Sequence, residues 1–170
     1  MWEKKDQPTL WLMDSQAVKN TDSASEKWFC HYKCTNGVKR HLLVDVLWFQ
    51  IGIVVTTANV SDKAWWKLLV KTYQNDVKKL DTLLLDNWYV GKGFKISIGK
   101  LTKWNVSVEI TPKPKWWKGF KPIHKRRIVE RSNARMEKCR RLRKNCERFI
   151  ETSEAMIKLC FIRLAVKRIA

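Results

Sequence analysis

Two short apolar runs, each followed directly by an aspartate, constrain the fold of this chain most. Residues 9–13 (TLWLM) precede Asp14, and the apolar-leaning residues 80–85 precede Asp86. Neither run shows much alternation between apolar and polar residues, which is typical of strands buried on both faces in the centre of a sheet. The sequence therefore predicts a helix-covered sheet with an acid after each of two central strands.

The rest of the pattern predicts strands first and helices afterwards. β-branched and apolar residues predict further strands at 39–47, 50–59 and 106–111. Helices are predicted at 63–72 with Asp62 as N-cap, at 94–101, at 128–146 and at 153–168. The last helix is apolar around most of its circumference, so we expect it to pack into the body of the protein. This order indicates one α/β domain over residues 1–170, a mixed sheet flanked by helices.

The charge balance favours a polyanionic partner. The chain carries 35 Lys and Arg against 16 Asp and Glu, a formal net charge of +19. Nucleic acid is the commonest partner of such a surface, and an enzyme for a free acidic small molecule would gain little from it. No apolar run approaches the roughly 20 residues that span a bilayer, and a secretory signal is not expected. Five scattered cysteines favour a reduced, cytoplasmic compartment over a disulfide framework.

Over half of the excess charge lies in residues 111–148, which hold 15 Lys or Arg and 3 Glu. Such a density repels itself unless phosphates neutralise it, which favours a polyanion-binding surface over a merely solvated helix face. Trp116 and Trp117 lie inside this stretch. They would either stack on unpaired bases or cover an edge of the sheet, and both readings stay open.

Three acids have positions that suit catalysis. Asp14 and Asp86 follow apolar strands, and the carboxyl ends of strands are where catalytic groups collect in open α/β sheets. Glu130 begins a helix in which nearly every other charge is positive. Each acid alone has a structural explanation, as a turn residue or as an acid favoured by the helix dipole. Together they suit two Mg²⁺ ions, which prefer carboxylate oxygens and neutralise the attacking and leaving oxygens of a phosphodiester.

Two features of the sequence suggest alternatives to this three-acid site. On a helical wheel an apolar stripe lies roughly opposite Glu130 and argues against its facing the sheet. The stripe consists of Ile128, Met136, Cys139, Leu142 and Cys146. Separately, Cys30, His31 and Cys34 have the residue types of a zinc site, but no second Cys/His pair follows at a suitable spacing, which disfavours zinc.

Six segments carry a family resemblance. They are MDSQAVK with Asp14, CHYKCTNGVKRHLLVD, TTANVSD, LLLDNWYVGK with Asp86, RRIVERSNARMEKCRRLRKNCER with Glu130, and EAMIKLCFIRLAVKR. Over nearly its whole length the chain resembles the catalytic part of bacterial insertion-sequence DDE transposases, of the group that includes insertion sequence families four and five. The fifth segment is the most specific of the six.

The resemblance implies a ribonuclease-H-like fold and a DNA transposase that hydrolyses a phosphodiester and transfers the freed 3′-hydroxyl to target DNA. Asp14, Asp86 and Glu130 would hold two Mg²⁺ (or Mn²⁺) ions, with Asp14 bridging both. Arg126 matches the family's arginine that contacts DNA near the active site. Together with the charge pattern, this gives the residues expected on DNA: Lys39, Arg40, Arg126, Arg127, Arg131, Lys138, Arg140 and Arg141.

The expected partner is double-stranded DNA, at insertion-sequence ends and at the target, in the nucleoid-associated cytoplasm of a prokaryote and away from membranes. A homodimer on DNA stays open. The chain is expected to lack the N-terminal region with which longer relatives bind the ends of the element.

The sequence also departs from the family pattern. Glu137 stands where relatives often carry a lysine, and Trp48 and Trp65 stand where they usually carry glycine. Trp88, two residues after Asp86, could crowd the metal site. An indole at a site that needs a positive φ or close packing costs stability. These departures favour a truncated or drifting copy, so two alternatives stand beside the enzyme: an inactive DNA-binding remnant, and a cellular nuclease or resolvase on the same fold.

Overall fold

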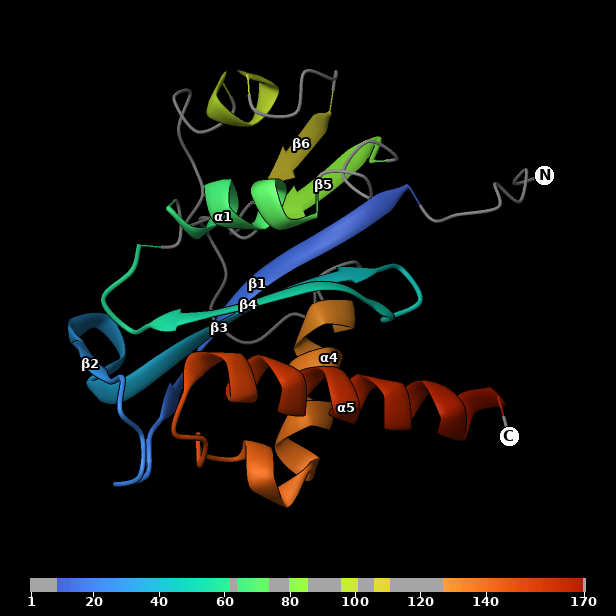
Figure 1. Ribbon diagram of the computed structural model, residues 1–170. Helices are drawn as coiled ribbons and strands as arrows, with labels where there is room; N and C mark the ends of the chain where they lie inside the picture. Colours follow the sequence, from blue (N-terminus) through green and yellow to red (C-terminus); the bar gives the residue numbers. More distant parts are fainter. Residues whose placement is uncertain are drawn as a thin grey trace, which may run out of the picture.

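A mixed sheet with β1 (Leu10–Lys19) near its middle organises the structure (Figure 1). The computed structural model describes residues 9–61, 64–73, 80–85, 96–100, 106–110 and 127–169. Within these residues, β3 (Thr35–Asp45) pairs antiparallel with one side of β1, and β5 (Thr82–Leu85) pairs parallel with the other. β6 (Ser107–Ile110) pairs parallel with β5. The predicted α/β class with a mixed sheet is therefore confirmed.

The far side of β3 carries two further strands. β2 (Trp28–Cys30) pairs antiparallel with its first residues, and β4 (Gln50–Thr57) pairs antiparallel with the rest. β2 was not predicted, because three residues followed by a 3-10 turn (η1, His31–Lys33) carry too little pattern to indicate a strand. The strands predicted at 39–47, 50–59 and 106–111 correspond to β3, β4 and β6 with shifted ends.

Both predicted apolar runs lie in interior strands, but β1 is longer than expected. It continues from Leu10 through Asp14 to Lys19, because each residue from Trp11 to Lys19 has a partner on β3. The expectation that Asp14 follows the end of its strand is therefore wrong: Asp14 lies inside β1, opposite Leu42. Ladder hydrogen bonds to a long neighbour carry the strand through residues that are themselves polar.

Alternate side chains of the sheet supply two separate cores. Trp11 and Met13 point to the face covered by α1 (Trp65–Thr72), where Trp65 and Trp66 are buried. The intervening Leu12 points to the other face, which is covered by α4 (Arg127–Lys138) and α5 (Ile150–Ile169). Full burial of each large apolar side chain contributes about 1.5–3 kcal/mol, so both helical layers hold the sheet in place.

The helix predicted at 128–146 is wrong in its second half. α4 ends at Lys138 and is followed by a short 3-10 turn, η3 (Arg140–Leu142). The reason is Asn145, whose backbone bonds to the strand end: its N–H donates to the Lys19 carbonyl (2.9 Å) and its carbonyl accepts from the Thr21 N–H (2.9 Å). Its side-chain oxygen also accepts from Ser153 Oγ at 2.8 Å. These contacts outweigh the helical propensity of residues 139–146.

α5 packs onto the body of the protein, as predicted, but through one face only. Ser153, Ile157, Cys160 and Phe161 are buried against the sheet, and Glu154 Oε1 accepts the Val55 N–H at 2.9 Å. The opposite face leaves four apolar side chains at least 57% exposed: Leu159, Ile162, Val166 and Ile169. No helix among the described residues is long and apolar enough to cross a membrane.

The remaining predicted helices agree in part with the structure. α1 begins at Trp65, and its N-cap, Ala64, makes no side-chain capping bond. Asp62, the expected N-cap, lies outside the described residues. Residues 96–100 are helical within the predicted 94–101.

Candidate active site

Asp14 lies on the face of β1 that α4 covers. Its neighbour Leu12 belongs to that core, and alternation along the strand puts Asp14 on the same side. Asp14 is half-buried, and its Oδ2 accepts a hydrogen bond from Asn133 Nδ2 at 2.9 Å. The carboxylate is thus held against α4.

A second contact shows how α4 runs along the strand. Gln16 Nε2 donates to Glu137 Oε1 at 2.7 Å. Two residues along β1 rise by about 6.6 Å, and the four residues from Asn133 to Glu137 rise by about 6 Å, so strand and helix advance together. Glu137, which stands where relatives often carry a lysine, therefore has a structural partner.

Glu130 precedes Asn133 by three residues, so the two side chains lie on one face of α4 about one turn apart. Glu130 is exposed, whereas the buried positions of α4 are Val129, Ser132 and Met136. The structure therefore brings the Glu130 edge of α4 next to Asp14, through Asn133.

Only Ile128 and Met136 of the predicted apolar stripe lie on α4, where Met136 is buried and Glu130 is exposed. Cys139, Leu142 and Cys146 lie beyond the end of α4, so they do not share its helical wheel. The stripe that argued against Glu130 is therefore shorter than predicted.

Asp86 lies outside the described residues. β5 ends at Leu85, immediately before it, and Leu84 pairs with Leu12, two residues before Asp14 on β1. In the described part of the chain, no group of three His, Cys, Asp or Glu could hold a metal ion. The donors that the structure does describe at this edge, Asp14 and Glu130, are carboxylates, the ligand type that Mg²⁺ and Mn²⁺ prefer.

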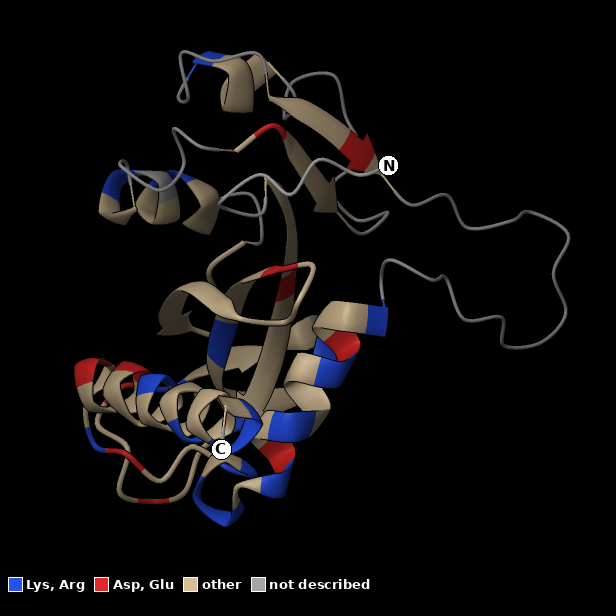
Figure 2. Cartoon of the chain, turned by 90° about the vertical axis from the view of Figure 1, so that its right-hand side faces the viewer, with Lys and Arg blue, Asp and Glu red and all other residues tan. Residues whose placement is uncertain are grey.

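The predicted DNA-binding residues fall into two groups. Arg127, Arg131 and Lys138 are exposed on α4, and η3 adds the exposed Arg140 and Arg141, so basic residues follow one another along this segment (Figure 2). Arg141 Nε donates to Glu147 Oε1 at 2.7 Å, and this contact raises the pKa of Arg141 above its ordinary value. Arg126 lies outside the described residues.

Lys39 and Arg40 are positioned differently. Lys39 is half-buried, and its Nζ donates to the Val60 carbonyl at 2.8 Å. Arg40 is only 1% exposed, and its Nη1 donates to the Leu142 carbonyl at 2.6 Å. Burial lowers the pKa of Arg40 to about 10. Its guanidinium thus lies between the sheet and η3, away from the surface where phosphates bind.

A scan against family models matches residues 5–165 to the transposase DDE domain. The chain belongs to the DDE transposase family. Members of this family are polynucleotidyl transferases that generally use divalent metal ions. No curated protein matches the chain.

The fold of this DDE transposase domain has a similar solved structure. It is similar to a chain of the cryo-EM structure of a simian T-cell lymphotropic virus intasome in complex with the PP2A regulatory subunit B56 gamma, with a TM-score of 0.54 and 13% sequence identity. The similarity covers 91% of this chain and 47% of that chain, so the domain spans about half the length of its structural neighbour. The ribonuclease-H-like fold that the resemblance implied is confirmed.

The zinc alternative gains no support in this DDE transposase domain. Cys30 is buried at the end of β2 and Cys34 is exposed after η1, where its Sγ contacts the His31 carbonyl at 3.6 Å. Among the described residues, these three side chains belong to no group that could hold a metal ion.

Sequence reasoning missed Asn133, which donates to Asp14 and lies one helical turn after Glu130. Its only signal was its position, one helical turn after Glu130 in the Arg-Ser-Asn-Ala motif. It also missed Arg135 and Arg168, which lie over the indole ring of Trp48. A contact between the end of α5 and the β3–β4 turn leaves no pattern in the sequence.

Proposed function

We propose that this domain catalyses metal-dependent phosphodiester hydrolysis and strand transfer in the transposition of an insertion sequence, of the group that includes families four and five. The observation that carries the proposal is the hydrogen bond from Asn133 to Asp14, which fixes one acid against the helix that bears another. Asp86, which follows β5 directly, is the third acid of the proposed site.

Asp14, Asp86 and Glu130 would hold two Mg²⁺ or Mn²⁺ ions. Such ions supply charge neutralisation for the attacking and leaving oxygens of a phosphodiester. Asn133 orients the Asp14 carboxylate, because its amide fixes one carboxylate oxygen. Glu137 and Gln16 keep α4 in register with β1, so Glu130 stays level with this part of the strand.

The proposed substrate is double-stranded DNA, both at the ends of the element and at the target. Arg127, Arg131 and Lys138 would bind its phosphates along the exposed side of α4. Arg140 and Arg141 extend this surface, and charge reversal at both is expected to weaken binding to all sequences alike. We further propose that residues 1–170 act as one domain in the cytoplasm of a prokaryote.

Plasmid nicking by the purified protein tests the proposal. Supercoiled plasmid should be nicked only when Mg²⁺ or Mn²⁺ is added, and Asp14→Asn should abolish the nicking. Asp22→Asn is the matched control, because it makes the same change at an exposed aspartate in the turn after β1. Equal nicking by wild type and Asp14→Asn, or nicking in the presence of a chelator, would refute the proposed chemistry.

A DNA-binding remnant without catalysis is the second candidate. Glu137 favours it, because this acid stands at the family's usual lysine position and is bonded to Gln16. Metal-independent DNA binding with no nicking under any divalent ion would support the remnant and contradict the enzyme.

A further inference from the structure

Two arginines lie over the turn between β3 and β4, and a third lies close to one of them. Arg135 on α4 places its guanidinium carbon 4.0 Å from the centre of the Trp48 ring, and Arg168 on α5 lies 5.3 Å from the same ring. Arg131 lies one turn before Arg135 on α4. Elements far apart in the sequence therefore gather positive charge at one turn.

The turn itself is held in an unusual shape. The Trp48 backbone has a φ of 67°, the left-handed region that favours glycine, in agreement with the expectation that Trp48 occupies a glycine position. Asp45 Oδ1 accepts the backbone N–H groups of Leu47 and Phe49, each at 2.8 Å. Arg168 Nη1 donates to the Leu47 carbonyl at 3.1 Å. The aromatic platform beneath the arginines is thus firmly anchored.

The arginines of this cluster repel one another. Asp45 attracts Arg168, but its Oδ1 already accepts two backbone amides. Arg135 Nη1 is buried and has no hydrogen-bond partner in the described part of the chain. Burial, Arg131 and Arg168 together lower the pKa of Arg135. Like charges that crowd a buried donor are relieved by an anion.

The cluster also lies on a different edge of α4 from the acids. At 3.6 residues per turn, Arg131 and Arg135 point roughly opposite to Glu130 and Asn133. A DNA strand that reaches Asp14 and Glu130 at one edge must cross a helix about 10 Å wide to reach the other edge. A contact there would fix the strand's position without touching the reacting bond.

We propose that Arg135 and Arg168, which lie over Trp48, and Arg131, one turn before Arg135, bind one phosphate group of the DNA backbone. The proposal rests on the proposed function, since it takes DNA to be the ligand. The guanidinium groups supply charge and forked donors, which suit a phosphate better than a single-point cation would.

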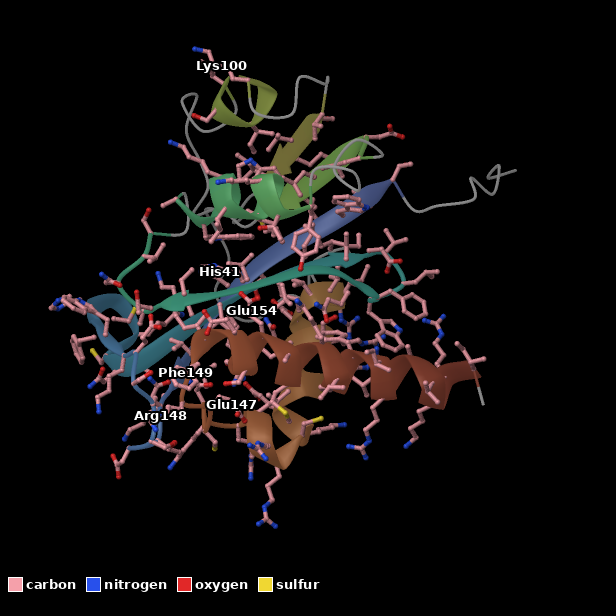
Figure 3. All side chains as sticks on the ribbon, in the orientation of Figure 1. His41, Lys100, Glu147, Arg148, Phe149 and Glu154 are labelled. Carbon is pink, nitrogen blue, oxygen red and sulfur yellow. The ribbon has the colours of Figure 1, made fainter. Side chains whose placement is uncertain are left out.

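Salt-dependent DNA binding tests this site, measured by fluorescence anisotropy with a labelled duplex and no divalent ion. The variants are Arg131→Gln, Arg168→Gln and the double variant. Lys100→Gln is the control, because it removes the same charge from an exposed residue at the opposite end of the molecule from α5 (Figure 3). Loss of one phosphate contact should lower the slope of log K against log salt by about 0.9, which weakens binding about eightfold at 0.1 M salt.

The outcomes separate the two proposals. A double variant with lower affinity and slope than Lys100→Gln supports the site, whereas values equal to those of the control overturn it. Arg168 also holds the Leu47 carbonyl. If Arg168→Gln fails to fold, Arg135→Gln decides, because Arg135 lies over Trp48 and does not belong to the exposed basic surface of α4; its loss should lower affinity at least twofold. Wild-type protein that binds no DNA overturns the proposed function as well.

Inorganic phosphate in excess, at constant ionic strength, distinguishes the source of the anion. Weaker DNA binding by the wild type, with a smaller effect on the double variant, supports a site that takes DNA phosphate. A rise in the unfolding temperature of the wild type alone, with normal DNA binding by the double variant, means that the cluster binds free phosphate. That result overturns the DNA assignment.

Discussion

His41 should make the stability of this domain depend on pH. Its ring is fully buried between β4 and α1: Nε2 lies 2.9 Å from Thr56 Oγ1, and the ring stacks on Trp65 with centroids 4.5 Å apart. Burial, with a smaller contribution from Lys39, lowers the pKa of His41 to about 3. The ring is therefore neutral in the folded protein throughout the physiological range.

The sign of the effect follows from proton binding. In the unfolded chain His41 takes up a proton below its ordinary pKa of about 6.5, whereas in the folded protein it does so only near pH 3. Between these values the unfolded state binds more protons, so the free energy of unfolding falls as pH falls. The loss reaches about 2 kcal/mol at pH 5 relative to pH 8, by the linkage relation at about 1.4 kcal/mol per pH unit.

Urea unfolding at pH 5 and pH 8, followed by tryptophan fluorescence, measures this loss. His41→Gln is the comparison, because glutamine can keep the hydrogen bond to Thr56 but does not titrate. Carboxylates elsewhere titrate in both proteins, so only the difference between the two reports His41. We expect the wild type to lose about 2 kcal/mol more than the variant. Equal losses would refute a buried, neutral imidazole.

Three further predictions address the site and the fold. Asn133→Leu should lower nicking by about 10- to 100-fold, because the Asp14 carboxylate loses its orientation, while the unfolding temperature stays unchanged. Unchanged nicking would show that Asn133 does not position this acid. Asn145→Ala should lower the free energy of unfolding, measured in urea titrations, by about 2–4 kcal/mol, because it leaves the buried Ser153 hydroxyl without its partner. A loss no larger than that of an exposed Asn→Ala change would contradict the proposed reason for the end of α4. Arg40→Met should leave the salt dependence of DNA binding unchanged, because Arg40 is buried; a lower slope in anisotropy titrations would place Arg40 on the DNA.

The fold was predictable where burial on both faces left its mark. The runs before Asp14 and Asp86 predicted interior strands because such strands contain few polar residues. β2 and the end of α4 could not be predicted in this way. Both depend on contacts with distant residues, such as those of Asn145 with the end of β1.

The site was predictable as residue types but not as geometry. Acids in a basic chain indicated the chemistry, and the family resemblance selected Asp14, Asp86 and Glu130. Their relation to one another could not be derived, because it depends on how α4 docks on β1 through Asn133. Arg40 was wrongly predicted to contact DNA. Its charge indicated an exposed position, but its side chain lies on the face of β3 that the helices cover.

The outward face of α5 has a consequence for handling this protein. Leu159, Ile162 and Val166 expose hydrocarbon to water beside Lys158 and Arg163. At low ionic strength, repulsion between strongly cationic molecules keeps such patches apart. Concentrated salt screens that repulsion, with a Debye length of about 3 Å at 1 M. It leaves the attraction between apolar surfaces intact. The high-salt buffer that removes bound nucleic acid from the domain is therefore also the buffer that promotes its aggregation.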